Sequence, residues 1–335
     1  MNRRILLVAN PGAEHVGAHL LSAAREMGLD VRMHNMENAY RAPRFIRSFN
    51  WWLRGRLPSR LKDFSQEIVE ASRDFRPTHV ITTGIAPISA AALDEIRGAV
   101  SGEPARLVNF LTDDPWNRAH LAPWFFEALT HYDTVFSPRR DVIGDLQAHG
   151  CRRVDYLPFA YSPEVHFPEA PPQPLVDHDV VFIGGGDPDR QKPVRALIDA
   201  GIRVALYGGY WDRDPRTRPF ARGFVGPREL RWVTGASKVV LGLIRRANRD
   251  GHSMRTFEAP AMHACLLTED TFEHREIFGE EGECVLYFCH HAEMIEKAHR
   301  LLGDASLRER LSAAAHAKIT GGGNTYRHRL TTMIG

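Results

Sequence analysis

Two residues of opposite charge, Arg255 and Glu258, are spaced for ligand chemistry. They are three apart, in a stretch that predicts a helix beginning near Ser253 and then a strand ending at Thr268. On one helix face, the carboxylate can accept hydrogen bonds from the vicinal hydroxyls of a ribose, and the guanidinium can meet a phosphate as a planar fork. An ordinary ion pair at the start of a surface helix fits the same residues and contributes little. The residue types alone leave both interpretations open.

A glycine-rich loop offers a second candidate site. Gly184–Gly186 follow a predicted buried strand and lead through Arg190 to a helix predicted to start near Pro193. Glycines let the backbone approach a diphosphate, the helix N-terminus supplies N–H groups, and the arginine adds a permanent charge opposite a leaving diphosphate. A plain turn between strand and helix needs glycine too. Asp187–Asp189 has the spacing of a metal-binding pair, but we interpret it as turn chemistry and predict no metal.

Two adjacent carboxylates, Asp113 and Asp114, follow the predicted strand Leu107–Leu111. Asp114, with Asp113 beside it, is the candidate general base for an acceptor hydroxyl, if burial or its neighbour raises its pKa. A helix cap fits the same sequence equally well. His15 and His120 are weaker candidates for the base, since isolated histidines near helices are commonly surface or core residues.

A basic and aromatic segment spans residues 41–62, with no acidic residue inside it. Its members are Arg41, Arg44, Arg47, Arg54, Arg56, Arg60 and Lys62, interleaved with Phe45, Ile46, Phe49, Trp51, Trp52 and Leu53. This pattern suits an anionic membrane surface or an extended acceptor, and stacking on single-stranded nucleic acid would use the same residues. The alternative is that the aromatic side chains pack on their own domain.

Short apolar runs alternate with amphipathic stretches of helical length along the chain, a pattern that predicts doubly wound parallel sheets. The predicted strands are Ile5–Ala9, Val31–Met33, His79–Thr83, Leu107–Leu111, Thr134–Phe136, Val154–Leu157, Val180–Gly184, Arg203–Tyr207, Lys238–Leu243, Cys265–Thr268 and Cys284–Tyr287. A proline-rich stretch within 163–177 divides them and predicts a linker. We therefore expect Rossmann-like domains at 1–162 and 178–320, facing each other across a cleft. Residues 321–335 should form a helix that returns to the first domain.

Composition excludes several classes of protein. The chain has 335 residues, which favours two domains, and its 43% apolar and 25% charged content is ordinary for a globular protein. A formal net charge of +2 argues against a dedicated nucleic-acid binder. No apolar run is long enough to span a bilayer, and the N-terminus fits a secretory signal poorly, so we predict a cytoplasmic location. Four cysteines are too sparse for a disulfide scaffold, and Cys284, Cys289, His290 and His291 lack a second ligand pair for zinc.

The sequence resembles the CgeB-like glycosyltransferases, which belong to the wider group-1 set with the GT-B fold. The resemblance runs from Arg255 to Thr268 and continues through Glu276-Ile277-Phe278, Glu283–Tyr287, Met294–Leu302, Asp304, Arg308 and the tail 324–329. Its specific part is Arg255–Glu258 and the residues around it. Weaker similarity covers Val180–Gly184 with Arg190, Leu206-Tyr207-Gly208 with Trp211, Leu111–Pro115 and Tyr132–Phe136. One departure concerns Gly251, which stands where many retaining relatives have a first glutamate. Its absence leaves the contacts to the sugar ring, and the choice between retention and inversion, open.

The resemblance implies a metal-independent transferase that moves a sugar from a nucleoside-diphosphate donor, UDP above all, to a hydroxyl acceptor that is a glycan, a lipid-linked compound or a small molecule. It implies no cofactor and no nucleic-acid partner, with donor contacts from Glu258, Arg255, Arg190, Gly184, Gly185, Gly208, Ser253 and Phe257. The loop with Gly12 and His15 would border the acceptor, and residues 41–62 would contact an anionic membrane at its inner face. A nucleotide-sugar epimerase of the same fold and a non-catalytic bilobal binding protein are the alternatives.

Overall fold

The computed structural model describes residues 3–98, 104–172 and 178–335. They separate into two compact units, each with its own sheet. The N-terminal unit comprises Met1–Pro158 together with Ala247–Arg249 and Tyr326–Gly335, and the C-terminal unit comprises Phe159–Arg246 and Asp250–Thr325. Residues 163–172 of the predicted linker form neither helix nor strand, and residues 173–177 lie outside the described residues.

The N-terminal unit is built on a parallel six-stranded sheet in the order β2-β1-β3-β4-β5-β6. The strands are β1 (Arg4–Ala9), β2 (Asp30–Asn35), β3 (His79–Thr83), β4 (Arg106–Phe110), β5 (Thr134–Ser137) and β6 (Val154–Tyr156). The α-helices are α1 (Val16–Glu26), α2 (Arg44–Leu53), α3 (Leu61–Phe75), α4 (Ala90–Gly98), α5 (Pro123–Leu129), α6 (Ile143–Ala148) and α13 (Tyr326–Ile334), with short 3₁₀ turns η1 (Met36–Tyr40) and η2 (Arg140–Val142).

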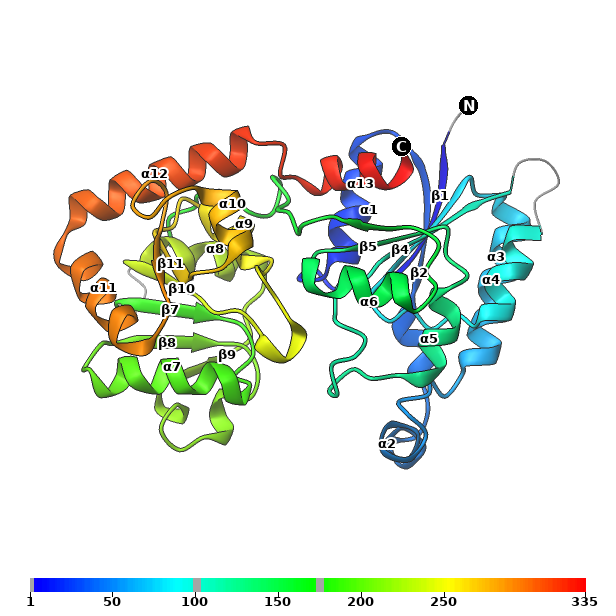
Figure 1. The fold of residues 1–335 in the computed structure, drawn as a ribbon, viewed down its shortest axis with the longest axis horizontal. Coiled ribbons are helices and arrows are strands. Elements are labelled where there is room, and N and C mark those ends of the chain that lie inside the picture. The colour runs from blue at the N-terminus through cyan, green and yellow to red at the C-terminus, as the bar shows by residue number, and fades with distance from the viewer. Residues whose placement is uncertain (1–2, 99–103, 173–177) are drawn as a thin grey trace. The chain divides into compact units, whose positions relative to one another are not determined.

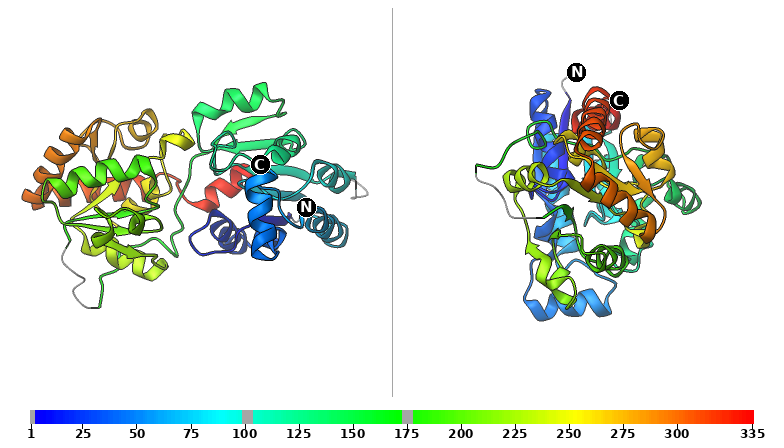
Figure 2. Two further views of the ribbon diagram at one scale, coloured as in Figure 1. Left: turned by 90° about the horizontal axis from the view of Figure 1, so that it is seen from below. Right: turned by 90° about the vertical axis from the view of Figure 1, so that its left-hand side faces the viewer.

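Helices cover both faces of this sheet (Figures 1 and 2). One face carries the main core, in which Leu6 and Val8 of β1 pack with Ile68 of α3, Leu93 of α4 and side chains of α5 and α6. On the other face α13 packs on α1, where Tyr326 stacks on His19 with ring centroids 5.0 Å apart. The C-terminal helix therefore returns to the first domain, as predicted.

The C-terminal unit has a second parallel sheet, in the order β12-β11-β10-β7-β8-β9. Its strands are β7 (Val180–Ile183), β8 (Val204–Tyr207), β9 (Ala221–Gly223), β10 (Val239–Gly242), β11 (Leu266–Glu269) and β12 (Leu286–Phe288). Its α-helices are α7 (Pro188–Asp199), α8 (Pro227–Ala236), α9 (Arg255–Ala261), α10 (Phe272–Phe278), α11 (His291–Gly303) and α12 (Ala305–Gly321), with the 3₁₀ turns η3 (Trp211–Arg213) and η4 (Arg218–Phe220). A further 3₁₀ turn, η5 (Arg246–Asn248), follows β10.

Strand order in this sheet reverses between β7 and β10. Side chains of α7 and α11, including Leu197 and Leu301, pack into one core with β7, β8, β10 and β11. The connections from β9 to β10, β11 and β12 run in the opposite direction to the connection from β7 to β8. Because such crossovers are right-handed, α8, α9 and α10 lie on the other face. This is the doubly wound arrangement in which ligands bind at the carboxyl edge, beside the point of reversal.

The structure confirms the predicted fold class, with two differences. The strand β9, Ala221–Gly223, was not predicted, because it has only three residues and two of them are exposed. Helix α7 begins at Pro188 and not near Pro193, so the expected start was wrong by more than a turn. The physical reason is a cap: Asp187 accepts a hydrogen bond from the backbone N–H of Arg190, and a proline at the first position needs no N–H partner.

No helix among the described residues is long and apolar enough to cross a membrane.

One buried histidine makes stability depend on pH. His274 donates from Nδ1 to the carbonyl of Glu269 at 2.8 Å, its Nε2 lies 3.0 Å from the Thr256 hydroxyl, and burial lowers its pKa from 6.5 to about 4. Below pH 6.5 the unfolded chain takes up a proton that the folded chain refuses until about pH 4. We therefore expect the free energy of unfolding to fall in this window by up to about 1.4 kcal/mol per pH unit for this residue.

Thermal unfolding at pH 7 and pH 5 checks this expectation. His274→Gln should be less stable at pH 7 but should show a flatter pH profile than the wild type. Equal pH slopes for the two proteins would show that His274 does not cause the loss.

Candidate functional site

The carboxyl edge of the C-terminal sheet holds a pocket of about 430 Å³ next to the point where strand order reverses. Its lining comes from the start of α7, the ends of β10, β11 and β12, and the start of α11: Asp189, Arg190, Pro193, Ile244, Arg246, Glu269, Phe288, Cys289, His290, His291 and Ala292. Arg190 is the one sequence-predicted site residue in this lining. The pocket is thus positioned by topology as a ligand site of a doubly wound sheet.

Arg190 ties the glycine-rich loop to the neighbouring strand. Its guanidinium donates to the carbonyl of Gly185 at 3.4 Å and to that of Leu243, just after β10, at 3.0 Å. The side chain is buried, and burial lowers its pKa from the ordinary arginine value. The Nε of Arg190 has no hydrogen-bond partner among the described residues. The cation therefore ties the glycine-rich loop to the residue that follows β10.

Glycines are required where the loops after β7 and β8 meet. Gly184 donates to the carbonyl of Tyr207 at 2.8 Å, and its own carbonyl accepts from the indole of Trp211 at 2.8 Å. Gly208 has a φ of 117°, and a Cβ added there would lie 2.4 Å from the Gly184 oxygen. A side chain at this position is excluded by both backbone conformation and contact.

We expect Gly208→Ala to destabilise the C-terminal unit by roughly 2–5 kcal/mol, the sum of positive-φ strain and overpacking. Urea unfolding measures the loss. Gly303→Ala is the matched control, because a Cβ there meets nothing within 4 Å. Equal stability of the two variants would contradict the close approach.

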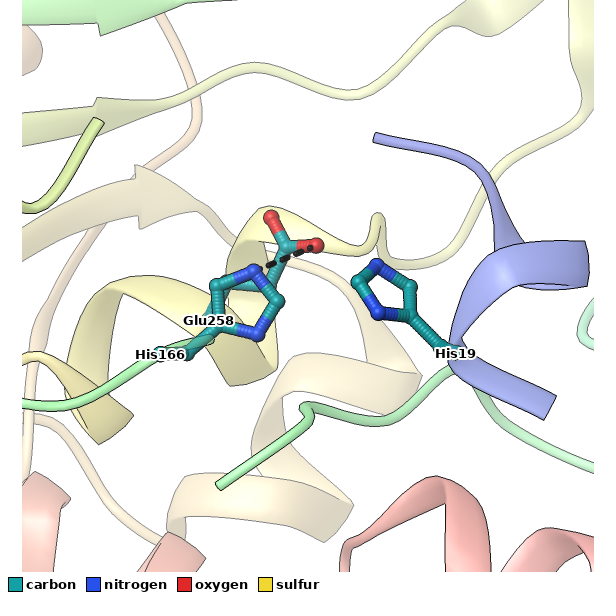
Figure 3. A group of neighbouring side chains, drawn as sticks. All are labelled: His19, His166 and Glu258. Atoms are coloured by element: carbon teal, nitrogen blue, oxygen red, sulfur yellow. Dashed lines mark ion pairs between the residues drawn. The ribbon is translucent and has the colours of Figure 1, made fainter. Parts of the chain in front are cut away.

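Glu258 and Arg255 lie together on α9. An Nη1–Oε2 distance of 2.7 Å joins them, and the Glu258 side chain is 4% exposed. On its other side, the Nε2 of His166 lies 3.5 Å from Oε1 (Figure 3). Burial, with help from the charge of Arg255, lowers the pKa of His166 to about 3, so this histidine is neutral near pH 7. Within the described residues, Nε and Nη1 of Arg255 have no hydrogen-bond partner of good geometry.

The other two predicted residues of this segment are Phe257 and Ser253. Phe257 is fully buried, with its ring edge-on to His252 at 5.6 Å. The backbone N–H of Ser253 donates to the hydroxyl of Thr256 at 3.1 Å, just before α9 begins. Phe257 thus anchors the helix that carries Glu258, and its side chain faces the core.

Gly251 lies against a neighbouring carboxylate. A Cβ added at this position would lie 2.0 Å from the carboxylate of Glu273, a buried residue of α10. The Gly251 carbonyl also accepts a hydrogen bond from Thr271 at 2.6 Å. A side chain at the position where the sequence departs from its relatives would therefore have to displace the Glu273 carboxylate. Sequence reasoning missed Glu273, because nothing in the spacing links it to Gly251.

In the N-terminal unit, Asp114 is held in a two-pronged ion pair. Arg249, which belongs to the same unit, donates to its two oxygens at 2.6 and 3.0 Å. Hydrogen bonds to Asp114 and, to a smaller extent, to Asp145 raise the pKa of Arg249. The backbone N–H of Asp114 donates to Asn248 at 3.0 Å. Asp114 is buried, and both of its carboxylate oxygens accept hydrogen bonds from Arg249.

Asp113 is more accessible and stands beside a histidine. Its Oδ1 lies 3.7 Å from Nε2 of His120, and about a third of each side chain is exposed. Asn248 donates to the same oxygen at 3.3 Å. The pair lies after the carboxyl end of β4, where the sequence placed the two carboxylates.

Gly12 and His15 lie in the loop after β1, at the same edge of this sheet. The N–H of Gly12 donates to the side chain of Asn10 at 2.9 Å, and His15 lies 3.5 Å from Glu14. His15 is about half exposed and does not cap α1 with its side chain. Within the sheet, β3 separates this loop from the Asp113 segment.

Sequence reasoning did not single out Glu269 and Arg246. Glu269 ends β11 and accepts from the backbone N–H of Ile244 at 3.1 Å and from Arg246 at 2.5 Å. Burial raises the pKa of Glu269. The available signal was an acidic residue directly after the predicted strand Cys265–Thr268, and it was overlooked.

Comparisons with known proteins agree with this fold. Residues 190–335, less than half of the chain, match the family described as "Glycosyl transferase-like". No curated protein matches the sequence. Sucrose-phosphate synthase from Thermosynechococcus elongatus superposes with a TM-score of 0.68 at 12% identity, over 99% of this chain and 97% of that one.

Two other solved structures are similar. The Anabaena protein HepE, in complex with UDP-glucose, gives a TM-score of 0.61 at 12% identity over 98% of both chains. The lipopolysaccharide outer core galactosyltransferase WaaB, in its apo form, gives 0.59 at 12% identity over 99% of this chain and 98% of that one. The chain therefore has the α/β fold of the GT-B glycosyltransferases, and its residues 190–335 match a glycosyl transferase-like family.

Proposed function

We propose that this protein is a glycosyltransferase that moves a sugar from a nucleoside-diphosphate donor to a hydroxyl acceptor. The observation that carries the proposal is the Arg255–Glu258 pair, fixed 2.7 Å apart on α9 beside the carboxyl edge of a doubly wound sheet. These residues lie inside the region that matches the glycosyl transferase-like family. A ribose diphosphate presents vicinal hydroxyls to a carboxylate and phosphates to a guanidinium, which is the chemistry that this pair can complement.

In the proposed reaction, Glu258 accepts hydrogen bonds from the donor ribose. Arg255 stabilises the negative charge that grows on the diphosphate as its bond to the sugar breaks, and Gly184 and Gly185 let the diphosphate come close to the backbone. Gly208 keeps that loop in place, and Arg190 braces it. The chain's own cations supply this stabilisation, so the mechanism that we propose needs no metal and no cofactor.

The N-terminal unit supplies the base. We assign that role to Asp113 with His120, because their accessible pair can take the proton of an acceptor hydroxyl while the hydroxyl oxygen forms the new glycosidic bond. Asp114 holds the segment in position through Arg249. Gly12 and His15 are proposed to border the acceptor.

Several finer assignments belong to the proposal. The donor is a UDP-hexose, and the transferase is CgeB-like. The acceptor-side domain spans residues 1–162, the linker 163–177, the donor domain 178–320 and the returning C-terminal helix 321–335. The UDP and UDP-glucose complexes of HepE support uracil as the nucleotide base of the donor. We further propose a cytoplasmic location with contact between residues 41–62 and the inner face of an anionic membrane, for which the composition of that segment is the support.

A thermal-shift panel of UDP, GDP, dTDP, ADP, CMP and NAD tests the proposal. A nucleotide present at about 100 times its dissociation constant should stabilise the protein by roughly 2.7 kcal/mol. We expect UDP to give the largest shift. A response to NAD alone, or to none of the nucleotides, would reject a nucleotide-sugar site.

A nucleotide-sugar epimerase of the same fold would bind the same donor but need no acceptor. Product analysis separates the two activities: an epimerase returns an isomer of the nucleotide sugar, whereas a transferase releases UDP. A non-catalytic binding protein would bind the donor and leave it unchanged.

A further inference from the structure

Helix α2 exposes an unusual amount of apolar surface. Six of the ten large apolar side chains that are exposed in the described chain lie on it, among them Phe45 at 74%, Trp52 at 77% and Leu53 at 73%. Figure 1 shows α2 standing away from the sheet of its own unit and from α3 and α4. The side chains of Phe45, Trp52 and Leu53 therefore do not pack on their own domain.

The exposed side chains form one face. Phe45, Phe49, Trp52 and Leu53 are spaced i, i+4, i+7 and i+8, which places them within about 100° of the helix circumference. Asn50 is the buried residue of α2, and its side chain donates to the hydroxyl of Ser59 at 3.1 Å. This contact holds the Asn50 side of α2 against the protein, so the apolar face points to solvent.

The turn after α2 is anchored as well. Arg56 donates to the carbonyls of Leu121 at 2.7 Å and Arg118 at 2.5 Å, and its own carbonyl accepts from the indole of Trp124 at 3.3 Å. Its guanidinium also lies 5.3 Å from the ring centroid of Trp51. The turn that follows the exposed helix is therefore hydrogen-bonded to α5 and to the loop before it.

Cations surround the apolar face without partners. Arg41, Arg44, Arg47 and Arg54 are all exposed, and none forms an ion pair within the described residues. Arg60, at the end of the segment, differs: it pairs with Glu67 at 2.7 Å. Four free arginines thus accompany four exposed apolar side chains on a single helix and its approach.

We propose that α2 is a docking helix for an anionic phospholipid bilayer. Its apolar face would enter the boundary between headgroups and acyl chains, and its free arginines would pair with lipid phosphates. A second copy of the same helix is a poor occupant, because the arginines of the two copies would repel. Nucleic acid is less suited, because Leu53 and Ile46 add aliphatic surface that bases do not need. The inference stands whether or not the proposed transferase activity does.

Vesicle flotation of the full chain tests the docking helix directly. We expect binding to phosphatidylcholine vesicles that contain phosphatidylglycerol, much weaker binding to pure phosphatidylcholine, and a blue shift in tryptophan emission on binding. Replacing Arg41, Arg44, Arg47 and Arg54 by Gln should weaken binding by roughly fivefold per arginine. Replacing Phe45, Phe49, Trp52 and Leu53 by Ser should abolish it.

The matched control is Phe224→Ser with Phe272→Ser, two exposed aromatics of the C-terminal unit that should leave flotation unchanged. Circular dichroism of each variant checks that it folds. Equal binding to neutral and anionic vesicles, no vesicle binding, or loss in the control variant would overturn the proposal. So would binding of single-stranded nucleic acid through the same residues with no vesicle binding.

Discussion

Replacing Glu258 by Gln should weaken the binding of UDP by about 10- to 150-fold. The change keeps the size of the side chain but removes its charge, and hydrogen bonds to a charged group contribute about 1.5–3 kcal/mol each. Glutamine also presents an NH₂ group where a ribose hydroxyl needs an acceptor. Isothermal titration with UDP measures the loss.

The same substitution disturbs Arg255, since a buried ion pair that loses one partner is destabilised. The titration must therefore be accompanied by a melting curve of the variant without ligand. Glu296→Gln, an exposed residue of α11, is the control and should bind UDP as the wild type does. A folded Glu258→Gln protein with an unchanged dissociation constant would remove Glu258 from the donor site.

Replacing Asp113 by Asn should lower turnover by about 10²–10⁴-fold, the usual contribution of a positioned general base. The expected loss is in kcat, with the dissociation constant for UDP unchanged, because Asp113 belongs to the N-terminal unit and has no proposed contact with the donor. His120→Gln should show a comparable loss, since the two side chains form one pair. Steady-state kinetics with saturating donor measures both.

The Asp114→Asn variant tests whether Asp114 has a structural or a catalytic role. It breaks the contact with Arg249 and should cost about 3 kcal/mol of stability or somewhat less, because the arginine side chain is 32% exposed. If Asp114→Asn abolished turnover without loss of stability while Asp113→Asn stayed active, the assignment of base and brace would be reversed.

The sequence predicted the sheets well because their strands are buried on both faces. His79–Thr83 is buried at all five positions, and its bounds agree with the prediction. The strand Ala221–Gly223 escaped detection because an edge strand of three residues carries no apolar signal. The start of α7 was misplaced because Pro193 was taken for the first-turn proline, whereas Pro188 fills that position after the Asp187 cap.

Long-range contacts explain what the sequence did not predict about the candidate site. Arg249 stands 135 residues after Asp114, and no local pattern indicates that Ala247–Arg249 belongs to the N-terminal unit. The carboxylate that a Cβ at Gly251 would meet belongs to Glu273, 22 positions away and on another element. Arg255 and Glu258 were found because their spacing is local, and helical geometry alone brings them together.

The central claim is tested most directly by incubating the protein with UDP-glucose, UDP-galactose and UDP-N-acetylglucosamine in the presence of a lipid extract, and measuring UDP release and sugar incorporation by mass spectrometry. The account predicts that one donor is consumed, with UDP and a glycosylated product formed in equal amounts, and that Glu258→Gln and Asp113→Asn suppress both. Conversion of a donor only into its isomer, or failure of every nucleotide sugar to bind, would contradict the assignment as a glycosyltransferase.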